Sequence, residues 1–519
     1  MNINQITLPF DIGIIIPHND PVRTLHYITN LLDYTCLQNL YYKNGELKTY
    51  KPKLLFQLIL LGYMNHIFSS RKIENACRKD ITFMWLLQGQ KAPDHNTINR
   101  FRQEVGYVID SLFSQFIEYL ITVNEIKTDH VFIDGTKLES FANKYTFVWK
   151  KSTSKYDNKM MEKIELSIAQ INKEYEMNFN YTEENQAALL DDILTTLLSL
   201  KESKGVVFVY GKGKRKVPLQ RDIELFEGYL ERRIKYDHYY ETLGKRNSFS
   251  KTDPDATFMH MKEDHMRNSQ LKPAYNIQAA ASGGYCVGVD VSTERSDQLT
   301  LIPFLSYLES SLGLEFKDIV ADAGYESEEN YKYLEMNNQT SYIKPTNYER
   351  SKNSNYKKKI NLRENMDYDK AKDIYTCKNN RILSVTRETT RTSKSGYTAD
   401  IKVYTCESCE GCEIKSKCTK SKSERQVHVS EEFIRLRNES TDNITTELGK
   451  KLRMNRSIQI EGLFGVIKED YGFRRFLTKG REHVTAEIKL LMFAFNMNKF
   501  NRKMQNDELG FKFYPLKAG

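Results

Sequence analysis

The sequence predicts an α/β protein that begins with a helical region and carries two insertions. Between residues 129 and 345 the pattern runs strand, strand, strand, helix, strand, helix and strand, which is an α/β layout. Residues 1–128 show helical patterns instead, and the polar stretches 150–250 and 346–445 interrupt the alternation. The length of 519 residues suits about three domains at roughly 150 residues each. We therefore expect a mixed sheet with flanking helices, an all-helical N-terminal domain, a helical insertion and a cysteine-rich β insertion.

The composition excludes a mostly disordered chain and a membrane protein. Hydrophobic residues make up 40% and charged residues 28%, which suits a soluble protein with a sizeable core. The longest apolar stretch, at 54–64, is interrupted by Gln57 and falls short of the ~20 residues that a membrane span needs. The first residues show no secretory signal, so we expect a cytoplasmic protein. The net charge of +9 permits a polyanionic partner but does not identify one.

The N-terminal region, residues 1–128, is predicted to bind DNA. Pro52 suits the first turn of an apolar helix. Ser69 or Ser70, and then Asp94, suit the N-caps of two further short helices. These two helices carry the basic residues Arg71, Lys72, Arg78, Arg100 and Arg102. Short helices with basic faces suit a helix-turn-helix type of DNA-binding domain, with a plain helical bundle as the alternative.

The predicted sheet occupies residues 129–149 and 251–345. Its strands are stretches rich in β-branched and aromatic residues, and a turn signal at 282–284 separates the second strand from the third. The strands are expected at 129–140, 274–281, 285–292, 318–325 and 341–345, and the helices at 298–312 and 326–338.

The first insertion, residues 150–250, is interpreted as a charged helical arm, such as a helical hairpin. Apolar residues recur there on one helical face, at Leu190, Ile193, Leu194, Leu197 and Leu198. The sequence GKGKRK at 211–216 lacks the GxxxxGK[ST] spacing of a phosphate-binding loop, so it is interpreted only as a basic loop. Helical patterns return over 446–504 and are followed by a short tail, 505–519.

Five of the eight cysteines gather in the second insertion, residues 346–445. Cys36, Cys77 and Cys286 stand in apolar surroundings and are interpreted as core residues. The other five are Cys377, Cys406, Cys409, Cys412 and Cys418. In a reducing compartment such crowding favours a structural Zn²⁺, because thiolates two residues apart can reach one tetrahedral ion. A redox-active thiol cluster and a chance cluster in a surface loop remain alternatives.

Three acidic residues are candidates for a second metal site. Asp134 lies within the first strand, Asp322 at the end of the fourth, and Glu461 on a helical stretch where Ile458 and Phe464 share its face. An acid in apolar surroundings is costly to bury unless it is paired or binds a cation. Mg²⁺ prefers carboxylate ligands, and two such ions ~3.5–4 Å apart can activate an attacking oxygen and stabilise a leaving one. The three residues together therefore predict a metal-dependent phosphodiester site.

Motifs along most of the chain are similar to those of a known family. SSRKIENAC and PDHNTINRFR lie in the N-terminal region, and IDGTKLESFANKYTFVWKK, TDPDATF, AYNIQAA, VADAGYES and IEGLFGVIKEDYGFRRFLTKG follow in order. Together they resemble the DDE transposases of bacterial insertion sequences. The resemblance implies a ribonuclease-H-like core with Asp134, Asp322 and Glu461 as the catalytic, metal-binding carboxylates. It also implies two Mg²⁺ (or Mn²⁺) ions, duplex DNA at transposon ends and target, a homodimer on paired ends, and a nucleoid location.

The resemblance extends to the residues around Glu461 and to the cysteines, with two departures. The family has a Lys seven positions after the catalytic Glu, and Lys468 fits. Arg456 stands one position away from the family's Arg, and no Tyr stands at the expected place. The cysteines match the family's C-x2-C-x5-C. The implied zinc ligands are Cys377, Cys409, Cys412 and Cys418, with Cys406 as a spare or a substitute.

Several further residues are candidate DNA contacts. Trp149 could stack on an unpaired base, with a core position as the alternative. Basic residues after the catalytic Glu suit phosphate contacts, with a solvated loop as the alternative: Arg474, Arg475, Lys479 and Arg481. The predicted function is transposition, meaning end binding, end cleavage and joining to target DNA. The alternatives are a catalytically silent DNA-binding protein derived from a transposase, and a metal-dependent nuclease of the same fold without strand transfer.

Overall fold

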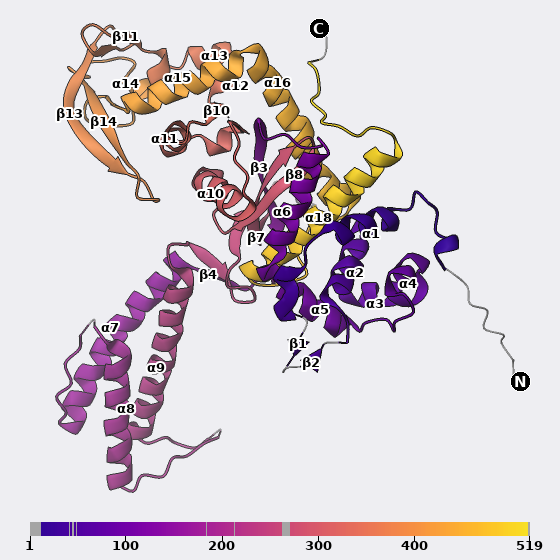
Figure 1. The fold of residues 1–519 in the computed structure, drawn as a ribbon. Helices are drawn as coiled ribbons and strands as arrows, with labels where there is room; N and C mark the ends of the chain where they lie inside the picture. Colours follow the sequence, from indigo (N-terminus) through magenta and orange to yellow (C-terminus); the bar gives the residue numbers. More distant parts are fainter. Residues whose placement is uncertain are drawn as a thin grey trace, which may run out of the picture. The chain divides into compact units, whose positions relative to one another are not determined.

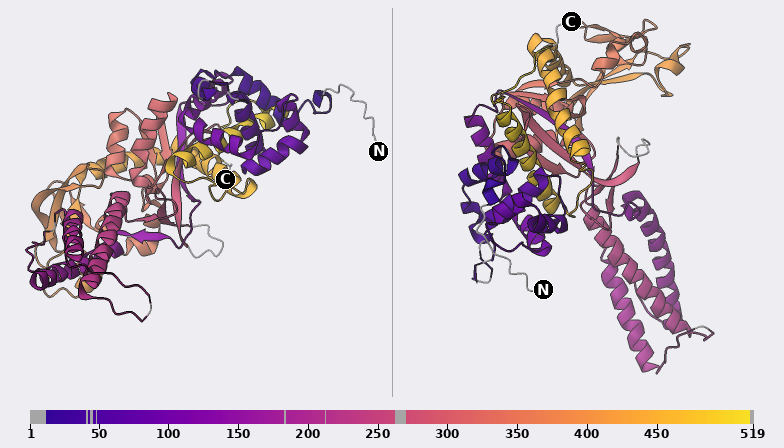
Figure 2. Two further views of the ribbon diagram at one scale, coloured as in Figure 1. Left: turned by 90° about the horizontal axis from the view of Figure 1, so that it is seen from below. Right: turned by 90° about the vertical axis from the view of Figure 1, so that its right-hand side faces the viewer.

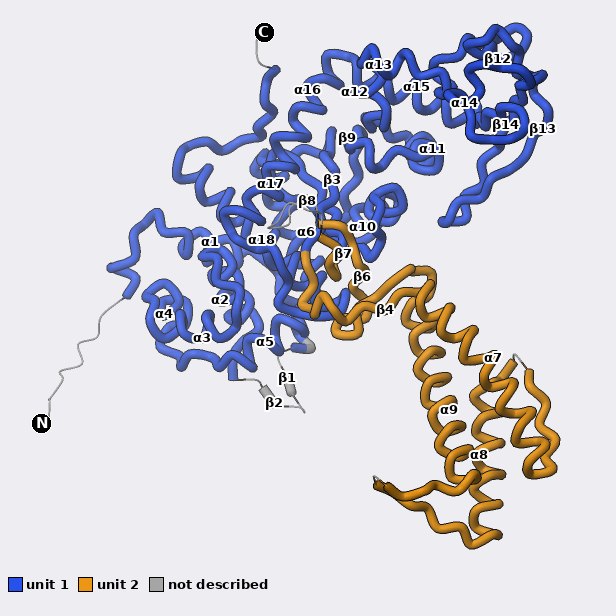
Figure 3. Tube along the Cα trace, turned by 180° about the vertical axis from the view of Figure 1, so that it is seen from behind, with its two compact units in different colours: residues 1–138, 275–519 blue, residues 139–274 orange. Residues whose placement is uncertain are grey.

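The computed structural model describes residues 12–40, 42–43, 46–47, 49–182, 184–211, 213–261 and 270–516. The chain forms two compact units (Figure 3). Unit 2 comprises residues 139–274, and unit 1 comprises residues 1–138 and 275–519. Unit 2 is therefore inserted in the sequence between two parts of unit 1.

The N-terminal part of unit 1 is mainly helical (Figure 1). Asp94 caps a helix as predicted, because its side chain accepts hydrogen bonds from the backbone N–H groups of Asn96 and Thr97. The helices are α1 (Pro21–Leu31), α2 (Pro52–Met64), α3 (Ser70–Lys79), α4 (Ile81–Leu87), α5 (His95–Glu104) and α6 (Ile109–Thr122). The prediction of an all-helical region is wrong in one detail. Strands β1 (Tyr42–Lys43) and β2 (Glu46–Leu47) pair there, and the sequence between them reads Asn-Gly, a signal of two-residue hairpin turns.

A mixed sheet follows, which confirms the prediction of a mixed α/β fold. Its strands are β3 (His130–Glu139), β6 (Thr257–His260), β7 (Leu271–Ser282), β8 (Tyr285–Ser292), β9 (Asp318–Ala321) and β10 (Thr340–Ile343). The strand order is β10-β9-β3-β7, with β8 antiparallel to β7, and β6 antiparallel to the first residues of β7. Strand β9 runs parallel to both β3 and β10. Helices α10 (Leu301–Leu312) and α11 (Glu328–Met336) connect β8 to β9 and β9 to β10.

The long C-terminal helix α18 (Arg481–Gln505) packs against both α2 and β8 (Figure 1). Sixteen of its 25 residues are buried. Asn496 bonds the backbone of Cys286 on β8 twice, accepting from the N–H at 2.9 Å and donating to the carbonyl at 2.7 Å. On the other side, Phe493 stacks on Phe116 of α6, with ring centroids 4.9 Å apart. Helix α18 therefore joins the N-terminal helices to the sheet.

The second insertion forms a separate antiparallel sheet of five strands in unit 1. Its strands are β11 (Asp367–Asp369), β12 (Ile374–Thr376), β13 (Ile382–Thr392), β14 (Thr398–Cys406) and β15 (Gln426–Val429). The short helices nearby are α12 (Tyr348–Ser351), α13 (Ser354–Lys357) and α14 (Lys415–Cys418). Helix α15 (Glu431–Thr445) leads from this sheet into the segment that carries Glu461.

The predicted helical pattern over 446–504 is interrupted. Helix α16 (Glu447–Arg456) continues into a π-helical turn (Ser457–Glu461), α17 (Gly462–Gly465) and a second π-helical turn (Val466–Asp470). Residues 471–480 are not helical, and α18 begins only at Arg481. Glycine explains both ends of this break, because Gly472 and Gly480 have φ values of 64° and 80°, which a right-handed helix does not allow.

The described part of unit 2 contains three helices rather than the predicted hairpin (Figure 2). They are α7 (Lys150–Tyr175), α8 (Gln186–Ser203) and α9 (Pro218–Leu243), and β4 (Phe147–Trp149) pairs with β5 (Ser248–Ser250) at their base. Leu190, Ile193, Leu194 and Leu197 lie in the core between the helices, as the pattern predicts, whereas Leu198 is exposed. Of the basic loop 211–216, Lys212 lies outside the described residues.

No helix among the described residues is long and apolar enough to cross a membrane.

Candidate active site

Two of the three predicted carboxylates lie at the same level of the sheet. In the parallel pair β3–β9 the register places Phe132 opposite Val320. Asp134 stands two residues further along β3, and Asp322 stands two residues after Val320 in extended backbone just past the end of β9, so both side chains point to the same face. Asp322 comes directly after the last residue of β9, where its side chain accepts the backbone N–H of Gly324 at 2.7 Å.

The third carboxylate, Glu461, is connected to Asp134 by the guanidinium of Arg456. One terminal nitrogen of Arg456 lies 3.3 Å from Oδ2 of Asp134, and the other lies 2.6 Å from Oε1 of Glu461. Ser457 also donates its hydroxyl to Oε2 of Glu461 at 3.1 Å. The positively charged guanidinium of Arg456 therefore lies between the carboxylates of Asp134 and Glu461.

The π-helical turn explains the position of Arg456 in the sequence. In an α-helix the residue four positions before Glu461 would lie beside it. Residues Ser457–Glu461 form a π-helical turn, in which hydrogen bonds join residues five positions apart. This wider turn brings the residue five positions before Glu461, which is Arg456, next to the carboxylate.

Glu461 itself is not buried in apolar surroundings, contrary to the prediction. Its side chain is 49% exposed, and Ile458, which was expected to share its face, is 42% exposed. Phe464 is buried. Polar contacts with Arg456 and Ser457, rather than apolar packing, hold Glu461 in place.

The environment raises the pKa of Asp134 from 3.8 to about 6. Burial is the largest cause, and the negative charges of Asp322 and Glu461 add to it. The positive charge of Arg456 and the backbone N–H of Gly135, 2.9 Å from Oδ1, act in the opposite direction. All three predicted carboxylates are therefore close enough to interact electrostatically.

A fourth carboxylate, Asp297, adjoins these residues and was not predicted. Its Oδ1 accepts hydrogen bonds from Asn276 at 2.7 Å and from Gln278 at 3.2 Å. A methyl group added to Gly324 would lie 2.9 Å from Oδ1 of Asp322 and 3.2 Å from Oδ2 of Asp297. The sequence does contain a signal for it. Asn276 and Gln278 lie two residues apart in the apolar run AYNIQAAA, so their two amide side chains face the same side of a strand, where buried amides need a polar partner.

By donor type the four carboxylates suit a divalent cation such as Mg²⁺ or Mn²⁺. Within the part of the chain that the structure describes, no group of three or more His, Cys, Asp or Glu side chains is arranged so that it could hold a metal ion. Arg456 lies between two of the carboxylates.

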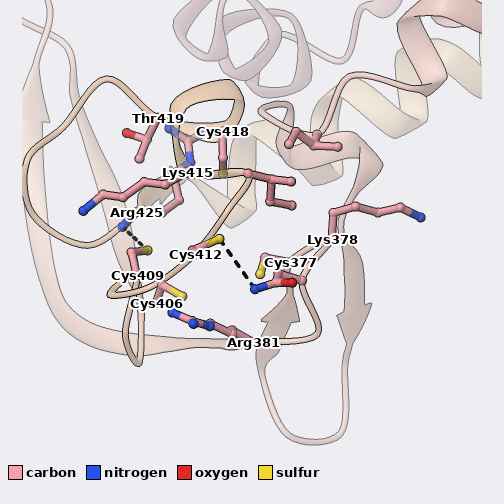
Figure 4. Close-up of a pocket in the computed structure, with 13 residues that line it drawn as sticks. Cys377, Lys378, Arg381, Cys406, Cys409, Cys412, Lys415, Cys418, Thr419 and Arg425 are labelled. Carbon is pink, nitrogen blue, oxygen red and sulfur yellow. Dashed lines mark hydrogen bonds between the residues drawn. The ribbon is translucent and has the colours of Figure 1, made fainter.

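The five clustered cysteines line one pocket at the end of the second sheet (Figure 4). Cys406 and Cys409 are buried, and the other three are partly buried. The backbone N–H of Arg425 donates to Sγ of Cys409 at 3.3 Å, and Asn379 donates to Sγ of Cys412 at 3.5 Å. Burial raises the pKa of Cys406 to about 12 and also raises the pKa of Cys418.

The N-terminal residues predicted to contact DNA are not all at the surface. Arg71 and Lys72 on α3 and Arg100 on α5 are exposed. Arg102 is only 2% exposed, donates to the carbonyl of Phe68 at 2.9 Å and lies over the ring of Tyr63. This burial contradicts the prediction that Arg102 is a DNA contact, because its guanidinium is already used inside the protein.

The basic residues after Glu461 have varied surroundings. Arg474 is exposed and pairs with Glu469 at 2.5 Å, and Arg481 donates to the carbonyl of Val291 at 2.8 Å. Arg475 and Lys479 are exposed, whereas Lys468 is partly buried in the second π-helical turn.

In unit 2, Trp149 is partly buried, with its ring 5.8 Å from that of Phe258 and 6.1 Å from that of Phe147. These contacts fit the core alternative as well as the stacking one, so the role of Trp149 in DNA binding stays a prediction.

Comparison with protein families finds two matches in this chain. Residues 376–501 match a family described as transposase DDE domain. Residues 10–104 match a family described as transposase domain (DUF772). The first match contains Arg456, Glu461 and all five clustered cysteines, whereas Asp134 and Asp322 precede it. Searches of curated proteins and of solved structures find no match.

The raised pKa of Asp134 predicts that Asp134→Asn changes how stability depends on pH. Between pH 3.8 and about 6 the folded protein keeps a proton that the unfolded chain loses, so the wild type loses stability as pH rises through this window. The shift corresponds to about 3 kcal/mol. We therefore expect the free energy of unfolding of Asp134→Asn, relative to that of the wild type, to rise by about this much from pH 4 to pH 7. Urea unfolding in the presence of EDTA measures it. The exposed Glu294→Gln is the control, and parallel pH profiles for wild type and Asp134→Asn would contradict the prediction.

Proposed function

We propose that this chain is a DDE transposase of an insertion sequence and that it cuts and joins DNA at the ends of its element, a proposal that the two transposase-family matches support. It would bind the terminal inverted repeats, cleave the ends and join them to target DNA. The observation that carries this proposal is the convergence of Asp134, Asp322 and Glu461 at one edge of the sheet, from two adjacent parallel strands and a helical segment far along the sequence.

We also propose that the core is ribonuclease-H-like. Its support is a central strand, β3, with the parallel strands β9 and β10 on one side and the antiparallel pair β7–β8 on the other. Asp134 and Asp322 stand just beyond the last paired residues of β3 and β9, Phe132 and Val320. In α/β sheets the carboxyl ends of parallel strands are the usual position of functional sites.

In the proposed mechanism Asp134, Asp322 and Glu461 would hold two divalent cations. Such ions, when bound, help to deprotonate the attacking oxygen and neutralise charge on the leaving one. The protein's own contribution is to fix these carboxylates on rigid elements and so align the DNA phosphate. Arg456 lowers the pKa of Asp134, which favours its ionised form near neutral pH.

DNA contacts are proposed along two surfaces of unit 1. The exposed residues Arg71, Lys72 and Arg100 support a DNA-binding role for α3 and α5. The segment after Glu461, with Arg475 and Lys479 exposed, would position the phosphates nearest the carboxylates. Pairing of two element ends would require at least a homodimer, and the protein would act at the nucleoid.

A structural zinc ion is proposed in the cysteine pocket, bound by Cys377, Cys409, Cys412 and Cys418. The shared pocket and the thiolate type of the donors support it. Cys406 lines the same pocket and would be a spare or a substitute ligand, because four thiolates already complete a tetrahedral site.

The substitution Asp322→Ala is predicted to reduce cleavage of a linear duplex with the element's terminal repeat by at least about a hundredfold in Mg²⁺, because it removes one of the metal-binding carboxylates. Gel analysis of the cut strands measures this, with Glu294→Gln as the matched acidic control on a nearby exposed loop. Retained cleavage in Asp322→Ala would refute the assignment of the site. Cleavage without products joined to a plasmid target would favour the nuclease alternative.

Metal analysis of the purified protein should find about one Zn²⁺ per chain. Cys412→Ser should lose this zinc, whereas Cys406→Ser should keep it because the other four cysteines complete the tetrahedral ligand set. Cys36→Ser, outside the cluster, is the control. A wild-type protein without stoichiometric zinc would refute the proposal.

A further inference from the structure

The helical arm of unit 2 is basic in one half and acidic in the other. Strand β4 pairs with β5, so α7, which follows β4, and α9, which precedes β5, meet at the same end of the arm (Figure 1). The half next to these strands, residues 141–163 and 232–251, contains twelve Lys and Arg but four Asp and Glu. Residues 164–231 contain eight Lys and Arg and twelve Asp and Glu. The positive charge of the arm is therefore concentrated in its first half, which we call the basic half.

Four lysines form a row along the surface of α7 in the basic half. They recur every four residues, so each lies about one turn above the last on the helix: Lys151, Lys155, Lys159 and Lys163. All four are exposed, and none of their side chains forms a hydrogen bond or an ion pair within the described part of the chain. With a rise of 1.5 Å per residue, this lysine row is about 18 Å long.

The lysine row is unfavourable for the helix that carries it. Like charges four residues apart on a helix repel one another. The row also begins in the first turn of α7, where the helix dipole disfavours cations and no side chain caps the helix. Of the two acidic residues within 150–163, Asp157 is buried and pairs with Arg233 at 2.7 Å, which leaves Glu162 alone at the surface. A partner with many negative charges would remove this repulsion.

Exposed aromatic side chains accompany the lysines in the basic half. Tyr145 is 74% exposed, Tyr156 is 61% exposed and Phe147 is 48% exposed. Nζ of Lys144 lies 5.1 Å from the centre of the Tyr145 ring. Tyr156 directly follows Lys155 of the row. Basic side chains interleaved with exposed aromatic rings are typical of surfaces that bind nucleic acids, where lysines neutralise phosphates and the rings contact bases.

We propose that the basic half of unit 2 binds the phosphate backbone of duplex DNA through the lysine row. The inference rests on the proposed function, because that function makes DNA the polyanionic partner. A duplex carries one negative charge per about 1.7 Å of its axis, so a stretch as long as the row presents about ten phosphates. A lysine ammonium binds phosphate as a point charge and reads no sequence there. Unit 2 thus holds DNA whatever its sequence, in addition to the two surfaces of unit 1.

Binding of a fluorescein-labelled duplex of random sequence to the full chain tests the proposal. Fluorescence anisotropy in EDTA, over a series of KCl concentrations, measures affinity without cleavage. The triple variant Lys151→Gln/Lys155→Gln/Lys159→Gln should bind about tenfold or more weakly than the wild type. The slope of log affinity against log salt should become shallower by about 2 to 3, because each lost phosphate contact accounts for about 0.9.

The matched control removes the same charge from the other half of the arm. It is Lys173→Gln/Lys201→Gln/Lys204→Gln, which should bind with the affinity and salt slope of the wild type. Circular dichroism and thermal unfolding establish that both triple variants are folded. If the row variant is unfolded, the single variants Lys155→Glu and Lys204→Glu replace the pair, and only Lys155→Glu should weaken binding. Light scattering reports the molar mass of each protein.

The outcomes separate the two claims. A folded wild type that does not bind duplex DNA would overturn the proposed function and this inference with it. DNA binding by the wild type, with the same affinity and salt slope in the folded row variant, would overturn the role of the lysine row alone. Equal weakening in the row variant and the control would also overturn it, since total charge would then explain the effect. Weaker binding together with a changed molar mass would instead assign the row to an interface between copies of the chain.

Discussion

The burial of helix α18 is the constraint on which the rest of unit 1 depends. Its Glu487 is fully buried and accepts hydrogen bonds from the backbone N–H groups of Leu477 and Thr478, which fixes the non-helical segment before it. Near its other end, Lys503 forms a buried ion pair with Glu125 at the end of the N-terminal helices. Removing one partner of such a pair typically costs about 3–5 kcal/mol, since the other charge stays buried. One helix thus joins the N-terminal helices, the sheet and the segment after Glu461.

That connection is what places a carboxylate from residue 461 beside the strand ends. Gln459, in the π-helical turn, accepts the backbone N–H of Gly284 in the turn between β7 and β8 at 2.8 Å. The π-helical turn is therefore attached to the sheet two residues before Glu461, and Arg456 attaches it again through Asp134. The π-helical turn and these two contacts with the sheet together fix the position of Glu461. The π-helical turn lets both Ser457 and Arg456 reach the carboxylate of Glu461, whereas a regular α-helix would direct only Ser457 to it.

The parts of the site that could be predicted are those encoded in short stretches of sequence. Asp134 and Asp322 follow apolar runs typical of buried parallel strands, so their shared sheet edge could be inferred. Arg456 looked out of register because no sequence pattern signals a π-helical turn. Arg102 looked like a surface residue because its helix is short and amphipathic, and only the packing of Phe68 and Tyr63 around it reveals otherwise. Asp297 depends on strand β7 and Gly324, which meet only in the folded chain.

The electrostatics of the site connect its stability to its chemistry. Gathering Asp134, Asp322 and Glu461 close together is unfavourable for the folded protein, since the charges of Asp322 and Glu461 add to the burial that raises the pKa of Asp134. The arginine offsets part of it for two of the carboxylates, because its guanidinium contacts both Asp134 and Glu461. A cation that binds the folded chain and not the unfolded one stabilises it by mass action. The repulsion among the carboxylates lowers the stability of the folded chain without a cation. A bound cation would relieve this repulsion, so the same repulsion would favour cation binding.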